Sequence, residues 1–142
     1  MEHILIIEDE RDVNRLLAQT LKEGGYKTTS AYDGMEGLRM AENGAFDLIM
    51  LDLMLPYFSG DEVLRRLREK SNVPVIMISA RDMVRTKTDL LTLGAVDYIT
   101  KPFDLGEVLA RVVSNLRRCK KEESRKQLTY GNLVLDKVFC FS

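Results

Sequence analysis

Apolar residues gather in five short segments along the chain, and the stretches between them carry apolar residues at helical spacing. The short segments cover residues 3–8, 27–31, 47–51, 74–79 and 97–100. The first and fourth contain continuous apolar runs, which are typical of strands covered on both faces in a parallel sheet. The pattern therefore predicts an α/β fold in which strands alternate with helices.

The helices between these strands are predicted with unequal strength. One stripe consists of Val13, Leu16, Leu17, Thr20 and Leu21, and it stops at paired glycines, residues 24–25. A longer stripe covers residues 105–116. The helix expected at 83–93 is the weakest, because its threonines are β-branched and lose side-chain freedom in a helix. Right-handed crossovers then predict a three-layer α/β/α sandwich around a five-stranded parallel sheet.

Composition and charge exclude several kinds of site. The formal net charge is −1, but residues 117–127 carry six basic residues against two acids, so the rest of the chain carries −5. An acidic body argues against nucleic-acid binding through phosphate contacts, and the basic stretch is interpreted as a solvated linker. One histidine and two cysteines are too few for a His-based triad, a zinc site or a disulfide framework. No apolar run approaches the ~18 residues of a membrane span, so a soluble, cytoplasmic protein without membrane contact is expected.

Polar residues follow four of the predicted strands. Parallel strands bring their carboxyl ends to one edge of the sheet, where sites in such folds gather. The residues concerned are Glu8, Asp9 and Glu10 after the first strand, Asp52 after the third, Ser79 and Ala80 after the fourth, and Thr100, Lys101 and Pro102 after the fifth. Any one of them could merely cap a strand or turn. Together they place carboxylates, a hydroxyl and an ammonium group at one edge.

This set of groups suits phosphoryl transfer to a carboxylate. Clustered carboxylates repel one another unless a cation relieves them, and Mg²⁺ suits oxygen ligands that include a phosphate. Lys101 could hold an anionic oxygen, and the Ser79 hydroxyl could donate to another. Asp52 is the predicted nucleophile, because it stands among apolar neighbours at the end of the central strand.

Four motifs follow one another in a fixed order within residues 3–118. They are Ile7-Glu8-Asp9-Glu10, residues 47–56 with Gly60, Ile78-Ser79-Ala80-Arg81, and residues 94–103. Their order and spacing resemble the receiver domain of two-component response regulators, in the winged-helix transcription-factor subfamily. The resemblance implies a flavodoxin-like (βα)5 fold with a doubly wound sheet.

The resemblance also implies a role for each matching residue. Asp52 would accept a phosphoryl group from a sensor histidine kinase. Asp9, Asp52 and the backbone carbonyl of Met54 would bind Mg²⁺, with Glu8 acting on the metal through water. Lys101 would contact the phosphoryl group. Such a protein promotes its own phosphorylation and dephosphorylation and is not an enzyme acting on other substrates.

Ser79 and Tyr98 match the switch pair of this family, in which the hydroxyl moves toward the phosphate and the aromatic ring turns inward. The movement would reshape the face formed by the fourth helix, the fifth strand and the fifth helix, so that a homodimer forms on phosphorylation. The helix at 83–93 would be mobile before phosphorylation. The Lys101–Pro102 peptide bond is cis in similar proteins, which proline permits at low cost.

The dimer face has five expected members. They are Lys87, Leu91, Asp97, Glu107 and Arg111. The resemblance implies that Lys87 pairs with Glu107, and Asp97 with Arg111, across the interface. Exposed ion pairs contribute only about 0–1 kcal/mol each, so these pairs would set the register more than the affinity.

Part of the usual charge network on that face is missing. Val96 stands where similar proteins usually carry an acid, and Thr92 and Val113 occupy positions often held by an acid and a base. We therefore expect a dimer that is weaker or that relies more on apolar contact.

Two other classes of protein share parts of the pattern. A Mg-dependent phosphatase of the haloacid dehalogenase type needs a second acid two residues after its nucleophile, where this chain has Met54. A flavodoxin-like FMN binder would bring its phosphate against the acids at 8–10, where charge repulsion opposes binding. Both classes are disfavoured.

The chain is expected to divide into a receiver domain at 1–118, a basic linker at 119–127, and the truncated start of a winged-helix DNA-binding effector domain at 128–142. Residues 128–136 resemble the opening strands of that effector domain. DNA would be bound only through the effector domain, which is absent here, and the protein would control transcription through it. The alternative is a stand-alone receiver that acts by binding a partner protein.

Overall fold

The computed structural model describes residues 1–80 and 91–128, and its strands form one parallel sheet. The strands are β1 (His3–Ile7), β2 (Lys27–Ala31), β3 (Leu48–Asp52), β4 (Val75–Ala80) and β5 (Asp97–Lys101). Their order across the five-stranded sheet is β2-β1-β3-β4-β5. Each strand lies within one residue of its predicted place. This order reverses direction at β1, as in a doubly wound sheet.

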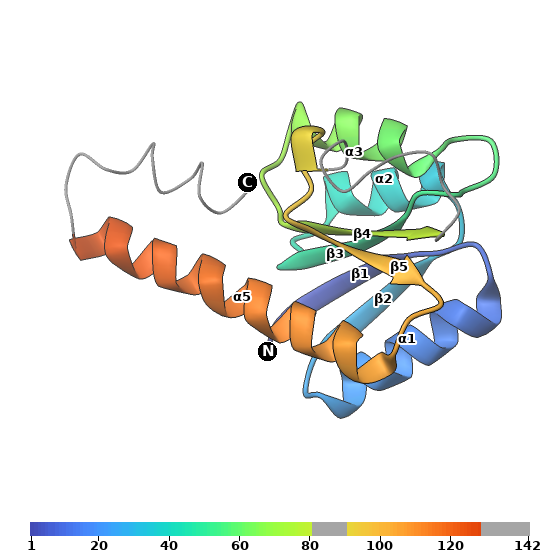
Figure 1. Ribbon diagram of the computed structural model, residues 1–142. Coiled ribbons are helices and arrows are strands. Elements are labelled where there is room, and N and C mark those ends of the chain that lie inside the picture. The colour runs from blue at the N-terminus through green and yellow to red at the C-terminus, as the bar shows by residue number, and fades with distance from the viewer. Residues whose placement is uncertain (81–90, 129–142) are drawn as a thin grey trace.

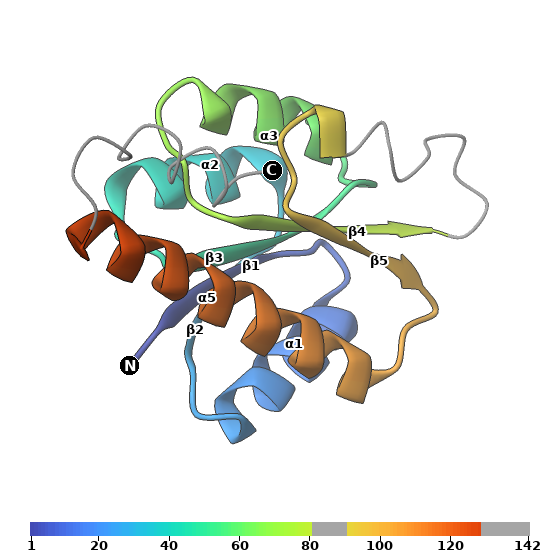
Figure 2. The same cartoon turned by 60° about the vertical axis from the view of Figure 1, so that its left-hand side comes forward.

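Helices cover both faces of the sheet, as predicted. They are α1 (Arg11–Glu23), α2 (Gly34–Asn43), α3 (Gly60–Arg68) and α5 (Leu105–Leu128). In Figure 1 and in the turned view of Figure 2, α2 and α3 lie on one face and α1 and α5 on the other. The predicted α/β/α sandwich is therefore confirmed. Most of the helix expected at 83–93, together with its predicted mobility, lies outside the described residues.

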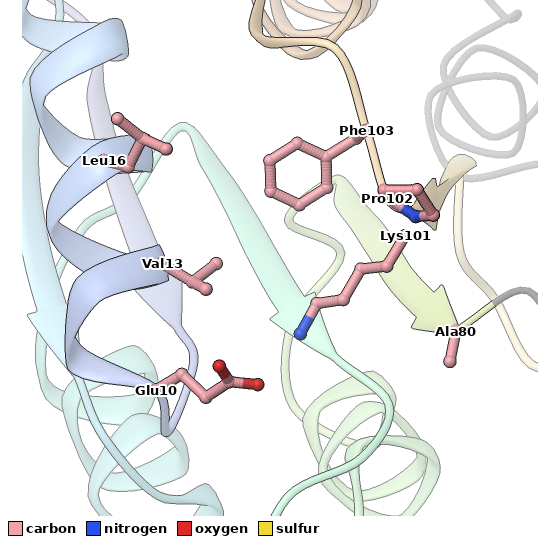
Figure 3. A pocket seen from close by; sticks show the side chains of 7 residues that line it. All are labelled: Glu10, Val13, Leu16, Ala80, Lys101, Pro102 and Phe103. Carbon is pink, nitrogen blue, oxygen red and sulfur yellow. The ribbon is translucent and has the colours of Figure 1, made fainter.

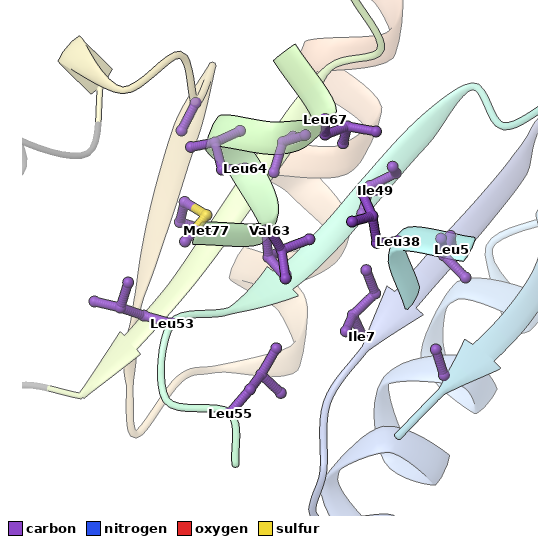
Figure 4. Packing of buried hydrophobic residues seen from close by; sticks show 14 residues of the cluster. Leu5, Ile7, Leu38, Ile49, Leu53, Leu55, Val63, Leu64, Leu67 and Met77 are labelled. Atoms are coloured by element: carbon purple, nitrogen blue, oxygen red, sulfur yellow. The ribbon is translucent and has the colours of Figure 1, made fainter. Parts of the chain in front are cut away.

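Two apolar clusters hold the layers together, one on each face of the sheet. Because side chains alternate along a strand, Leu5 and Ile7 point toward α2 and α3, whereas Ile4 and Ile6 point toward α1 and α5. All four side chains are fully buried, and each contributes roughly 2 kcal/mol through loss of apolar surface to water. Figure 4 shows the first cluster, with Val63 of α3 packed against the strands. Packing on both faces thus holds the central strands in place, and with them the carboxyl ends of these strands.

Helix α5 differs from the prediction in length. Val108 and Val112 are fully buried against the sheet, as the stripe at 105–116 predicted. The helix then continues to Leu128, through the stretch interpreted as a linker. Residues 117–127 contain neither Pro nor Gly and are rich in Lys, Arg and Glu, which favour helices. Charge alone did not reveal the helix, and the solvation of this stretch stays a prediction.

The helices of the described ranges, 1–80 and 91–128, differ from membrane-spanning helices in length or in apolar character. None of them is both long enough and apolar enough to cross a bilayer.

Candidate functional site

The acids predicted from the sequence meet at one edge of the sheet. Glu8 and Asp9 follow β1, and Asp52 is the last residue of β3. These strands are parallel neighbours, with Ile7 paired to Leu51, so their carboxyl ends lie side by side. One carboxylate oxygen from each of the three acids lies within 4.8 Å of the others. A single cation could contact all three.

Lys101, the last residue of β5, brings a positive charge into this cluster. Its Nζ lies 2.9 Å from Glu8 Oε1 and donates a hydrogen bond to Asp52 Oδ2 at 3.1 Å. Burial alone would lower the pKa of Lys101, but the hydrogen bond and charges of Glu8 and Asp52 outweigh burial and leave that pKa raised. The lysine is therefore a cation at neutral pH. The Lys101–Pro102 bond that follows is cis, as expected.

Glu8 is an acid without exposed surface. Burial raises the pKa of Glu8 to about 7, the ammonium of Lys101 opposes that rise, and the nearby Asp52 adds to it. Glu8 Oε2 accepts a hydrogen bond from the N–H of Glu10 at 3.1 Å. Within the part of the chain that the structure describes, Glu8 Oε1 has an ion pair with Lys101 but no well-aligned hydrogen bond. The negative charge on this buried oxygen is therefore only partly balanced, and a divalent cation would balance the rest.

The set of donor atoms fits a hard cation such as Mg²⁺. This ion prefers oxygen ligands and usually keeps several waters beside one or two carboxylates. Asp9 reaches solvent more than Glu8 or Asp52 does, so waters could remain on that side of the ion. The N–H of Met54 donates to Asp52 Oδ1 at 3.0 Å, which places the backbone of Met54 against the acid. The use of its carbonyl as a ligand stays a prediction.

Ser79 and Tyr98 lie on the neighbouring strands β4 and β5. Ser79 is only 5% exposed and follows Ile78, the residue that pairs with Asp52 in the sheet. Tyr98 is half-buried and packs against the cluster beneath α2 and α3. The fold thus brings the predicted hydroxyl to the strand end beside the acid. The coupled movement of Ser79 and Tyr98 stays a prediction.

The charged residues expected on the dimer face pair within one chain. Arg111 Nη1 lies 2.9 Å from Asp97 Oδ1, and Arg111 Nη2 lies 3.3 Å from Glu107 Oε2. Asn115 adds a hydrogen bond to Asp97 at 3.1 Å, which sequence reasoning did not foresee. Lys87 lies outside the described residues. Pairing across an interface stays a prediction, and it would have to compete with this internal network.

A groove opens beside the acidic cluster, between α1 and the segment that joins β5 to α5 (Figure 3). Its volume is about 560 Å³, and its lining is mostly apolar. The lining residues are Glu10, Val13, Leu16, Ala80, Lys101, Pro102 and Phe103. Leu16 is 46% exposed, although the sequence placed it in the buried stripe of α1. Apolar surface is therefore available next to Lys101.

The buried face of α1 differs from the predicted stripe. It consists of Asn14, Leu17, Ala18 and Leu21. Sequence reasoning missed Asn14, whose side chain is completely buried. Positions 14, 17, 18 and 21 fit the helical repeat no better than the predicted stripe does, so spacing alone could not show that Asn14 is buried.

Fold and site together define a class of protein. A doubly wound parallel sheet carries three acids and a lysine at its carboxyl edge, where such folds bind their ligands. The same edge has no glycine-rich loop after β1, where Glu8, Asp9 and Glu10 stand instead. This is an α/β domain suited to a cation and a phosphoryl group.

The sequence profile of the response regulator receiver domain matches residues 4–113. The chain belongs to this family. Among its curated relatives, the uncharacterized transcriptional regulatory protein YkoG of Bacillus subtilis is 47% identical over 134 residues, which are 92% of this chain and 59% of YkoG. The transcriptional regulatory protein PcoR of Escherichia coli is 42% identical over 139 residues, which are 97% of this chain and 61% of PcoR. The chain thus spans about three fifths of the length of these relatives.

Solved structures agree with this assignment. The receiver domain of the Francisella response regulator 1452 has a TM-score of 0.78 at 34% identity, covering 83% of this chain and 98% of that one. A CheY-like receiver domain protein from Methanospirillum hungatei has a TM-score of 0.80 at 28% identity, covering 86% and 98%. Family membership sets aside the phosphatase and FMN-binding alternatives.

Proposed function

We propose that Asp52 accepts a phosphoryl group from a sensor histidine kinase in a Mg²⁺-dependent reaction. The observation that supports this most strongly is the arrangement around Asp52. Lys101 lies 3.1 Å from one of its oxygens, and oxygens of Glu8 and Asp9 lie within 4.8 Å. Because a sensor kinase uses intracellular ATP, the proposal places the reaction in the cytoplasm.

The protein side of the reaction consists of orientation and charge. The N–H of Met54 and the ammonium of Lys101 each hold one oxygen of Asp52, which fixes the carboxylate at the strand end. One of these oxygens forms the new bond to phosphorus as the bond between phosphorus and the donor nitrogen breaks. Lys101 would then contact a phosphoryl oxygen. Asp9, Asp52 and the backbone carbonyl of Met54 would hold Mg²⁺, with Glu8 acting on it through water. When bound, Mg²⁺ neutralises charge on the phosphoryl oxygens.

Replacing Asp52 with alanine is expected to abolish this modification. Wild type incubated with Mg²⁺ and acetyl phosphate should gain the mass of one phosphoryl group, measured on the intact protein. Asp52→Ala should gain none, and wild type should gain none when the metal is chelated. A suitable control is Asp12→Ala, because Asp12 is an exposed acid of α1. Phosphorylation of Asp52→Ala at the wild-type rate would refute the assignment.

The proposed output is dimerisation through the face formed by residues 83–93, β5 and α5. Ser79 would move toward the phosphoryl group and Tyr98 would turn inward, so that added charge changes this face. The internal pair between Arg111 and Asp97 supplies charges there, and exposed or half-exposed pairs contribute little affinity.

Phosphorylation is expected to produce a dimer that is weaker than those of similar proteins or that relies more on apolar contact. Val96 and Val113 replace charges that similar proteins often carry, so less of the interface would be held by ion pairs. Sedimentation velocity with and without beryllofluoride, at two salt concentrations, measures the association. A tight dimer that dissociates steeply with added salt would contradict this expectation.

We further propose that residues 1–118 act as the receiver, that 119–127 act as the linker in helical form, and that 128–142 begin a winged-helix effector domain. Two relatives that match over nearly all of this chain are named as transcriptional regulatory proteins. Control of transcription through DNA binding by that effector domain follows as part of the proposal. The receiver would catalyse only its own phosphorylation and dephosphorylation.

A further inference from the structure

Asn14 is a fully buried polar residue that faces the end of the sheet from α1. Its Nδ2 donates to the carbonyl of Glu8 at 3.1 Å and to that of Ala31 at 3.2 Å, and it lies 3.5 Å from the carbonyl of Ile6. Its Oδ1 accepts a hydrogen bond from the hydroxyl of Ser30 at 2.5 Å. One amide therefore joins α1 to the ends of both β1 and β2.

The partners of Asn14 fix the orientation of its amide. Backbone carbonyls can only accept hydrogen bonds, so the NH₂ group must face Glu8 and Ala31, while the carbonyl oxygen faces the hydroxyl of Ser30. All strong hydrogen-bonding capacity of the NH₂ group is used by these two carbonyls. Leucine has the same branching at Cγ but is larger and offers no donor, and aspartate would present an acceptor to two further acceptors.

This amide determines where the first acids of the site stand. The N–H of Glu8 donates to the carbonyl of Ala31 at 3.1 Å, and the carbonyl of Glu8 accepts from Asn14. Both backbone groups of Glu8 are thus held, one by β2 and the other by α1. Asp9 is the next residue along the chain, so its direction depends on the same peptide plane. A small cation with strict ligand geometry is sensitive to such displacements.

We propose that Asn14 is a positioning residue for the cation site formed by Glu8, Asp9 and Asp52. It touches neither the cation nor the phosphoryl group, and it acts through the backbone of Glu8. This inference rests on the proposed function, in which these acids bind Mg²⁺. Loss of a residue that orients metal ligands typically weakens metal binding 10–100-fold, so Asn14→Leu should bind Mg²⁺ at least about tenfold more weakly than wild type.

The test compares Asn14→Leu with Leu21→Ala, a change on the same buried face of α1 but at its far end. Both substitutions should lower the thermal unfolding temperature, since both side chains are buried. Isothermal titration with Mg²⁺ alone, well below the unfolding temperature of each variant, gives the dissociation constant of the folded protein. Asn14→Leu should show the tenfold loss, whereas Leu21→Ala should match wild type within about twofold. A merely structural role would move both constants together.

Ser30→Ala provides a second variant that is less disruptive, because Ser30 is only partly buried. It releases the Oδ1 of Asn14 and should weaken Mg²⁺ binding roughly threefold, as expected for one hydrogen bond. If Asn14→Leu does not fold, Ser30→Ala decides: an unchanged constant overturns the inference. Equal Mg²⁺ binding by wild type and Asn14→Leu overturns it as well. If the wild-type protein binds no Mg²⁺, the proposed function itself is refuted. That result differs from equal binding by wild type and variant, which refutes only the role of Asn14.

Discussion

Replacing Gly60 with alanine is expected to lower the free energy of unfolding by about 3 kcal/mol, the upper part of the range for overpacking. Gly60 begins α3, and its N–H donates to the carbonyl of Leu53 at 3.0 Å. An added Cβ would lie 2.7 Å from Leu53 Cα and 2.9 Å from the carbonyl carbon of Asp52, and closer still to the carbonyl oxygen of Asp52. These atoms are backbone and cannot rotate away. Either α3 or the strand end that carries Asp52 must shift.

Urea unfolding followed by circular dichroism measures this loss, since the chain contains no tryptophan for fluorescence. The folded fraction of Gly60→Ala should also accept phosphoryl groups at least about tenfold more slowly, because each misplaced reacting group is costly in rate. Gly106→Ala is the matched control, since Gly106 stands in the first turn of α5, where a Cβ meets only the side chain of Asp104 at 3.1 Å. It should be neutral or slightly stabilising. Equal stability of wild type and Gly60→Ala would contradict the close approach of Gly60 to the backbone of Asp52 and Leu53.

Replacing Glu8 with glutamine is expected to stabilise the metal-free protein at pH 8 and to flatten its pH dependence. Burial raises the pKa of Glu8 to about 7 from an ordinary value of 4.5. Between pH 4.5 and pH 7, Glu8 is therefore protonated in the folded state and ionised in the unfolded state. The contribution of protonated Glu8 to stability is fully present below pH 4.5. It is lost as the pH rises through about 7. The loss is on the order of 3–4 kcal/mol, because the two pKa values differ by about 2.5 and each pKa unit corresponds to about 1.4 kcal/mol.

The experiment is urea unfolding of both proteins from pH 5 to pH 8 with a chelator present. The difference between wild type and Glu8→Gln isolates the titration of this one group from that of other groups. Glu10→Gln changes an exposed acid of the same turn and should leave the slope as in wild type. Saturating Mg²⁺ should restore wild-type stability at pH 8, since a ligand that binds only the folded state stabilises it. Parallel pH profiles for wild type and Glu8→Gln would contradict the assigned pKa.

The sheet and the core of the site followed from the sequence because both depend on local pattern. Continuous apolar runs predicted β1 and β4, and the parallel arrangement then required the residues after each strand to meet. That argument alone predicted that Asp52, Glu8 and Lys101 lie close together. The order of the strands could be anticipated only through the family resemblance. Apolar pattern says which segments are buried strands and does not say which of them are neighbours.

Other features could not be derived from the sequence, because they depend on how one side chain meets another. Asn14 is polar, so hydrophobic spacing assigned the buried face of α1 to Leu16 instead. Its burial makes sense only once the carbonyls of Glu8 and Ala31 are in place around it. Likewise, the contacts of Arg111 with Asp97 within one chain depend on the turn between β5 and α5. Charge identity alone could not distinguish an internal pair from one across an interface.

The unbroken course of α5 has a mechanical consequence. Its 24 residues form a rod about 36 Å long, at 1.5 Å per residue. Val108, Val112 and Leu116 anchor the near half against the sheet, whereas Figure 1 shows the far half extending past the body of the domain. A tilt of about 10° at the anchored base would displace the far end by roughly 6 Å for a rod of this length. A small repacking beneath β5 would therefore be amplified at the far end of α5, whereas a flexible tether would absorb it.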